Sequence, residues 1–191
     1  MQPIESICNR EFFPAFHHSG VRRESEIKWI VLHDEEATTA RSAAEWFKSR
    51  NSGGSAHLCV DDKECYRCLD NRSVPWGAAS TFGANTHGFH IEQAGFAFWS
   101  APIWKKHRRT LERAAYKTAV HLHRFGLPVQ FCDYLDLLHG REGVTTHNEV
   151  SKASRKQNPA RARDYTHSDP GPFWPRWWFM RRVRAYYGEL N

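Results

Sequence analysis

The side chains best suited to chemistry lie in two short motifs near the end of the chain. T-T-H-N-E-V contains His147, and T-H-S-D-P-G-P contains His167 and Asp169. A neutral imidazole and a carboxylate are common ligands of a divalent metal such as zinc. Asp169 precedes a Pro-Gly-Pro segment, in which proline fixes φ on either side of a glycine that can adopt angles closed to other residues. The Asp169 carboxylate therefore has a well-defined backbone position, which suits a metal ligand.

A third candidate ligand lies far upstream. Residues 27–33 (I-K-W-I-V-L-H) form a nearly continuous apolar run with β-branched residues, which predicts a buried strand that ends in His33. On its own, this histidine would more often be structural. Together, His33, His147 and Asp169 supply two nitrogen donors and one oxygen donor. Three protein ligands leave one tetrahedral position for water, which is the arrangement of a catalytic zinc site.

Glu92 is the candidate acid–base group. Residues 88–94 alternate in character, which predicts a strand with His90 and Glu92 on one face and Phe89 and Ile91 on the other. An unpaired charge inside a sheet is costly. A carboxylate buried there is therefore either paired with another group or takes part in proton transfer, and the residues alone leave both roles open.

The rest of the pattern predicts the elements that must position these residues. Apolar runs predict short strands at residues 55–60 and 65–69, joined by a hairpin turn at 61–63, and residues 143–147 are either a short strand or an extended approach to His147. Helical spacing predicts helices over residues 38–50, 105–125 and 175–189, and a helical turn at 133–138. The stretches 74–86 and 151–163 are polar and are predicted to be loops. Alternating strands and helices predict a single α/β domain over residues 27–191, with residues 1–26 packed on its surface.

Composition limits the classes of partner. The chain carries a net charge of +6, which favours an anionic partner such as nucleic acid, a membrane surface or a cell-wall polymer. The five cysteines are an odd number at irregular spacing, so a secreted disulfide framework is not expected. The N-terminus lacks the pattern of a signal peptide, and no apolar run is long enough to cross a membrane. We therefore expect synthesis in the cytoplasm without a signal peptide and no insertion into a membrane.

Several other residues have two readings. His57 and His90, on predicted strands, either line a substrate groove or pack in the interior. The pair Cys65 and Cys68 has the spacing of half a structural zinc site, but no second pair matches it, so core packing is preferred. The C-terminal run W-P-R-W-W-F-M-R-R-V-R is predicted to be a helix that packs its aromatic face and solvates its arginines. The alternative for this run is a patch that binds anions.

Taken in order, these motifs resemble the zinc-dependent N-acetylmuramoyl-L-alanine amidases of type 2. The segments on which this resemblance rests are I-V-L-H, S-A-H-L-C-V-D, V-P-W-G, N-T-H-G-F-H-I-E, V-T-T-H-N-E-V and H-S-D-P-G-P. They span residues 27–178, and H-N-E-V with H-S-D-P-G-P at this separation is the most specific part. The resemblance implies an α/β fold shared with peptidoglycan-recognition proteins, with a central mixed sheet flanked by helices and a zinc groove on one face.

The resemblance also implies roles for individual residues. His33, His147 and Asp169 would hold the zinc ion, and Glu92 would act as general base or orient water. His167 occupies a position that is commonly lysine in the family and stabilises the oxyanion there. A histidine could do so as a cation or as a neutral N–H donor, which affects the pH range of activity.

Candidate substrate contacts complete the predicted site. They are His57, Trp76, Asn85 and His90, all within the matching motifs. Many relatives have Trp-His where this chain has Trp76-Gly77, so Gly77 removes one substrate contact.

The activity that follows from the resemblance is hydrolysis of the amide bond between N-acetylmuramic acid and L-alanine in peptidoglycan. A phage endolysin acts in this way, and it reaches the wall after release by a separate membrane pore. The alternative is a non-catalytic peptidoglycan-binding module of the same fold, which would usually lack a metal ligand. A nucleic-acid binder is disfavoured because no nucleic-acid motif is present and the basic residues are scattered. We expect Zn²⁺ as cofactor, peptidoglycan and anionic wall polymers as partners, and a monomer.

Overall fold

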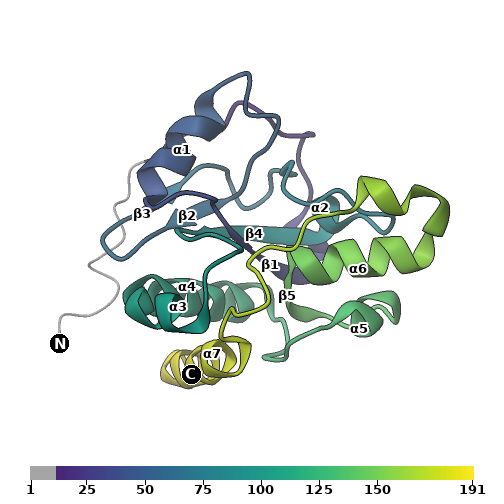
Figure 1. The fold of residues 1–191 in the computed structure, drawn as a ribbon. Coiled ribbons are helices and arrows are strands. Elements are labelled where there is room, and N and C mark those ends of the chain that lie inside the picture. The colour runs from purple at the N-terminus through teal and green to yellow at the C-terminus, as the bar shows by residue number, and fades with distance from the viewer. Residues whose placement is uncertain (1–11) are drawn as a thin grey trace.

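A five-stranded sheet lies at the centre of the computed structural model, which describes residues 12–191 (Figure 1). The strand order is β3-β2-β4-β1-β5, and only β3 runs antiparallel to its neighbour. The strands are β1 (Trp29–Asp34), β2 (Leu58–Val60), β3 (Cys65–Arg67), β4 (Gly88–Gln93) and β5 (Gly143–Thr146). The predicted α/β fold with a mixed sheet is therefore confirmed, as is the hairpin between β2 and β3.

Helices cover both faces of this sheet (Figure 1). They are α1 (Ala40–Lys48), α2 (Ala84–His87), α3 (Ala101–Lys106), α4 (Arg108–Phe125), α5 (Tyr134–Leu138), α6 (His147–Gln157) and α7 (Arg176–Glu189), with short 3-10 turns at Glu24–Glu26 and Pro159–Asp164. No helix among residues 12–191 is both long and apolar enough to span a bilayer.

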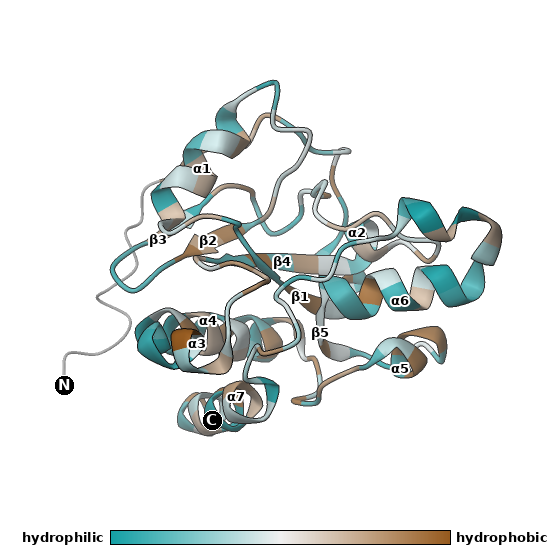
Figure 2. Cartoon of the chain, in the orientation of Figure 1, coloured by the Kyte–Doolittle hydropathy of each residue, from teal (hydrophilic) through white to brown (hydrophobic). Residues whose placement is uncertain are grey.

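The two faces of β1 bury different clusters because successive side chains alternate across a strand. Ile30 and Leu32 pack in the main core with residues of α4 and α7. Val31 packs on the opposite face with Val150 of α6. In Figure 2 the hydrophobic colour gathers on the central strands, whereas the outer side of α6 is hydrophilic. His33 follows Leu32 and therefore shares the α6 face with Val31.

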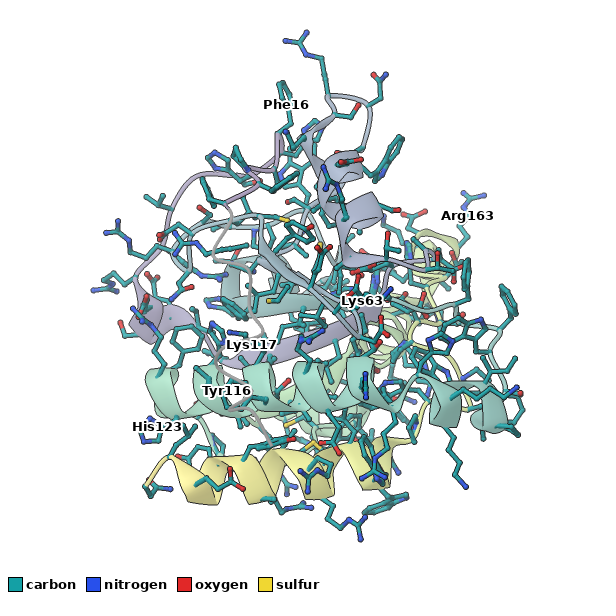
Figure 3. The ribbon with its side chains drawn as sticks, turned by 90° about the vertical axis from the view of Figure 1, so that its left-hand side faces the viewer. Phe16, Lys63, Tyr116, Lys117, His123 and Arg163 are labelled. Carbon is teal, nitrogen blue, oxygen red and sulfur yellow. The ribbon has the colours of Figure 1, made fainter. Side chains whose placement is uncertain are left out.

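Helix α7 packs along α4 on the far side of the main core (Figure 3). Tyr116 of α4 meets Tyr186 of α7 edge-on, with ring centroids 5.6 Å apart. Glu112 accepts hydrogen bonds from Arg182 and from the Tyr186 hydroxyl, each at 2.7 Å. The predicted packed aromatic face is correct for Phe179, which is buried, and wrong for Trp177, which is 78% exposed.

Two sequence predictions about helices differ from the structure. The helix predicted at residues 105–125 is two helices, α3 and α4, which meet at His107, whose ring stacks on Trp99 at 4.2 Å. The loop predicted at residues 151–163 was wrong, because α6 extends to Gln157. The buried face of α6 contains small residues, Ser151, Ala153 and Ser154, so it gives little hydrophobic signal.

The described part of the N-terminal segment makes backbone contacts with the sheet. The amides of Phe13 and Ala15 donate to the carbonyls of Arg67 and Cys68 at 2.9 and 2.8 Å. Arg22 is buried. A division of the chain at residue 26 stays a prediction. Cys8 lies outside the described residues, and the four described cysteines are buried thiols, as expected of core packing.

Candidate metal centre

The parallel strands bring three of the predicted site residues into one row. In the register of the sheet, His33 on β1 lies opposite Glu92 on β4, and Leu32 lies opposite Thr146 on β5. His147, the next residue after Thr146, begins α6, which Thr146 caps by accepting from the Glu149 amide. Because β4, β1 and β5 are adjacent and parallel, their carboxyl ends meet at one edge, where sites are commonly built in such sheets.

Asp169 reaches this edge from the segment that returns from α6 to α7 (Figure 1). Its carbonyl accepts from the Asn148 amide at 2.9 Å, which ties the segment to the start of α6. Gly171, two residues later, has φ +92° and lies against the backbone of Ala97. The segment is therefore held at Asp169 itself and again at Gly171.

The three candidate ligands converge. His33 Nδ1 lies 3.0 Å from Asp169 Oδ2, and His147 Nδ1 lies 3.1 Å from Asp169 Oδ1. One ligand atom from each residue falls within 4.8 Å of the other two, and all three side chains are buried. Two imidazole nitrogens and a carboxylate oxygen at this spacing fit one divalent ion such as zinc.

The charge states of these groups favour a cation. Burial would raise the pKa of Asp169, but hydrogen bonds from His147, His167 and His33 outweigh it and hold that pKa well below the ordinary value. Burial lowers the pKa of His147 to about 4. A carboxylate that keeps its charge and an imidazole that stays neutral are the forms that bind a metal.

Glu92 lines the same cavity and is buried. Its Oε2 has no hydrogen-bond partner among the described residues. Burial, followed by the negative charges of Asp169 and Glu35, raises the pKa of Glu92 well above its ordinary value. A carboxyl group with a raised pKa and a free oxygen can accept a proton and donate it again.

His167 lies on the solvent side of the centre. Its ring stacks on His147 at 4.1 Å, and its Nδ1 is 3.6 Å from Asp169 Oδ1. Interaction with that carboxylate raises the pKa of His167. The side chain is 63% exposed, so the imidazole can meet a bound molecule either as a cation or as an N–H donor.

A cavity of about 1020 Å³ opens in front of the centre. Trp76 and Asn85 line it, as expected of substrate contacts, although Asn85 Oδ1 already accepts from the amides of Gly77 and Ala78 at 3.1 and 2.7 Å. His57 and His90 are fully buried and are not among the lining residues. Contact of these four residues with substrate stays a prediction.

Among the lining residues with no role assigned from the sequence are Asp34, Glu35 and Trp46. The two acids directly follow His33, so proximity in the chain was a usable signal. Trp46 is spaced like a core residue of α1, yet it is 53% exposed at the cavity rim. Only its position on the second turn of the helix, on the side away from Ala44, distinguishes it.

Comparisons with known proteins agree with this architecture. Residues 23–172 match the family model described as N-acetylmuramoyl-L-alanine amidase. The Staphylococcus aureus hydrolase AmiA in complex with its ligand is similar with a TM-score of 0.67 and 18% identity, over 94% of this chain and 82% of that chain. The catalytic domain of XlyA has a TM-score of 0.61 and 18% identity, over 92% and 98% of the two chains.

A mutant endolysin from Bacillus subtilis has a TM-score of 0.61 and 19% identity, over 92% of this chain and 97% of that chain. At these identities the structural matches show a shared fold. A search of curated protein sequences gave no match.

Proposed function

The chain belongs to the N-acetylmuramoyl-L-alanine amidase family, and we propose that it is a zinc-dependent enzyme that cleaves the bond between N-acetylmuramic acid and L-alanine in peptidoglycan. The observation that carries this is the convergence of His33, His147 and Asp169, with Glu92 in the same row of the sheet. A catalytically inactive wall-binding module would have no need to keep the full ligand set.

His33, His147 and Asp169 would hold the ion. A divalent metal in such a site supplies Lewis acidity, which makes a carbonyl carbon more electrophilic and water more acidic. Glu92 would orient the attacking water, take its proton on Oε2 and pass that proton to the leaving L-alanine nitrogen. His167 would donate a hydrogen bond to the developing oxyanion, and one such donor is typically worth about 3–4 kcal/mol.

The cavity fits a polymeric substrate. Trp46 and Trp76 are half-exposed at its rim, and flat indole faces suit the apolar faces of sugar rings. The active form would be an endolysin-like enzyme that reaches the wall after release from the cell in which it is made.

The decisive experiment combines metal analysis with product analysis. Purified protein is expected to contain zinc, to clear suspensions of cell walls, and to release new L-alanine amino groups. Replacement of His33, His147 or Asp169 with alanine is expected to remove zinc content and lysis together. The exposed His139→Ala variant is the control and should retain both. Lysis that survives complete removal of zinc would contradict a zinc enzyme.

A further inference from the structure

His90 lies directly behind His33, on the side away from the cavity. It is fully buried on β4, and its Nδ1 is 3.0 Å from His33 Nε2. The two rings are stacked with centroids 5.1 Å apart. On the far side of the His90 ring, Nε2 is 3.2 Å from the carbonyl oxygen of Ala84. The Ala84 carbonyl, His90 and His33 therefore form a continuous chain that leads to the metal centre.

The carbonyl at the end of this chain sets the proton positions along it. A carbonyl oxygen can only accept, so His90 Nε2 must carry the proton. With its one proton on Nε2, the ring has a lone pair on Nδ1, which accepts. The partner in that contact, His33 Nε2, then donates. In the metal-bound form, His33 would then present the lone pair of Nδ1, the atom that faces Asp169, to the ion.

We propose that His90 is a positioning residue that presents Nδ1 of His33 to the metal in the required tautomer and orientation. This role rests on the proposed function, because it supposes that His33 is a ligand. A ligand histidine generally gives its second ring nitrogen to such a partner, and loss of that partner typically weakens metal affinity by about 10- to 100-fold.

The backbone around His90 is shaped to admit its ring. A Cβ atom built at Gly77 would lie 2.4 Å from His90 Nδ1, and the three nearest atoms to it all belong to the His90 ring. A Cβ atom at Gly88 would lie 2.6 Å from His90 Nε2. The missing side chain at Gly77, which is predicted from the sequence to remove a substrate contact, also leaves the space that the His90 imidazole occupies.

Other residues fix the acceptor at the end of the chain. The Ala84 amide donates to Ser80 Oγ at 2.7 Å, which holds the start of α2. The Arg22 guanidinium donates to the carbonyls of Asn85, Thr86 and Gly88 at 2.7, 2.6 and 2.9 Å. The segment that carries the Ala84 carbonyl is therefore held from both sides, so the hydrogen-bond chain has a rigid anchor.

The test is zinc affinity, measured by competition with a chromophoric chelator on the full chain. His90→Ala should bind zinc about 10- to 100-fold more weakly than the unmodified protein. His90→Asn can place an amide oxygen where Nδ1 lies, so it should recover most of that affinity. A residue needed only for packing would not show this rescue.

Gly77→Ala supplies an independent arm that leaves the interior residues unchanged. Its methyl group should displace the His90 ring and weaken zinc binding, whereas Gly188→Ala, where a Cβ meets open space, should not. In the His90→Ala background the ring is absent, so Gly77→Ala should add no further loss. Nitrogen-15 shifts of the zinc-bound protein should also show His33 protonated on Nε2.

The outcomes separate the two proposals. Failure of the unmodified protein to bind zinc would overturn the proposed function, and the role of His90 with it. Normal zinc binding by the unmodified protein, together with unchanged affinity in His90→Ala, would overturn the positioning role alone. If His90→Ala does not fold, unchanged zinc affinity in Gly77→Ala would overturn the positioning role of His90 and leave the proposed function standing.

Discussion

At the scale of single residues, the carboxyl groups of Glu92 and Asp169 have opposite properties within one cavity. Hydrogen bonds from three imidazoles keep Asp169 ionised, whereas Glu92 Oε2 receives none from the described residues and burial raises the Glu92 pKa. A carboxylate that stays ionised suits a metal ligand, and a carboxyl group with a raised pKa suits a proton carrier. The same kind of side chain can therefore serve two purposes, because the hydrogen-bond partners of the two carboxyl groups differ.

Glu92→Gln should separate catalysis from metal binding. The amide keeps the shape of the side chain but cannot accept a proton, so we expect amide hydrolysis to fall by about 10²- to 10⁴-fold. Zinc content and thermal stability should be preserved, because Glu92 is not among the converging ligands. Release of L-alanine amino groups measures the effect, and Glu45→Gln, on the exposed side of α1, is the control. Loss of zinc in Glu92→Gln would show that Glu92 is a ligand instead.

His57 should make the fold sensitive to acid. Burial and then the charge of Arg22 lower its pKa well below the ordinary value, so the folded protein keeps this ring neutral. Below the unfolded pKa of about 6.5, the unfolded chain takes up a proton that the folded chain does not, so stability falls as pH falls. Above that pKa, neither state is protonated at this ring and the penalty vanishes.

His57→Asn should remove this pH dependence. At pH 7.5 the variant is expected to be less stable by about 1–3 kcal/mol, because it loses the hydrogen bond to the Ser73 carbonyl. Between pH 6.5 and 5, its free energy of unfolding should decline less steeply, by up to about 1.4 kcal/mol per pH unit. Urea titrations of chelator-treated protein, repeated across this pH range, give the free energy of unfolding against pH for the unmodified protein and for the variant. Curves that stay parallel over this range would show that His57 is protonated in the folded state.

At the scale of elements, the site depends on which strands are neighbours. The apolar runs that precede His33 and His147, and the alternation around Glu92, were sufficient to predict β1, β5 and β4. The register that places the three side chains in one row depends on pairing between distant segments, which no local pattern contains. The family resemblance supplied that information as a ligand set.

Other features could not be predicted for identifiable physical reasons. Alternation assigned His90 to the site face of β4 but could not distinguish a lining position from one buried behind His33. The role of Gly77 depends on the position of that ring, which comes from another segment. Helix α6 was missed because small polar residues fill its buried face, so its periodicity is not hydrophobic.

The loop that carries Asp169 should tolerate no side chain at Gly171. A Cβ atom there would lie 2.0 Å from the carbonyl oxygen of Ala97, and φ is +92°. Gly171→Ala is therefore expected to lose at least roughly 2 kcal/mol of stability. It is also expected to bind zinc more weakly, because the backbone displacement that relieves the clash extends to Asp169, two residues away. Chemical denaturation and zinc analysis measure these effects, with Gly188→Ala as the control. Full zinc affinity in Gly171→Ala would show that the segment moves independently of the carboxylate.

At the scale of the whole molecule, charge is distributed unevenly. Asp34, Glu35, Glu92 and Asp169 all line the cavity, yet the net charge is +6. The surface outside the cavity is therefore more positive than the net value suggests. Such a surface attracts an anionic polymer at long range, while the ionised Asp169 in the cavity favours a cation at close range.

Helix α7 is the element on which this attraction can be tested without disturbing the site. Its buried residues include Phe179 and Val183, whereas Arg181 and Arg184 are exposed. Each arginine-to-glutamate change lowers the net charge by 2, so the variant Arg181→Glu/Arg184→Glu carries +2 in place of +6. We expect weaker co-sedimentation with purified cell walls at low salt and a smaller further loss when salt is added, because fewer charges are left to screen.

The measurement is best made in the Glu92→Gln background, so that the walls are not digested during sedimentation. Circular dichroism and the unfolding midpoint should be unchanged, since both arginines point away from the packed face of α7. Replacement of both residues with lysine keeps the charge and should keep the affinity. If that lysine variant binds as weakly as the glutamate variant, the arginines act through specific hydrogen bonds; if the glutamate variant binds normally, attraction to the wall does not involve this helix.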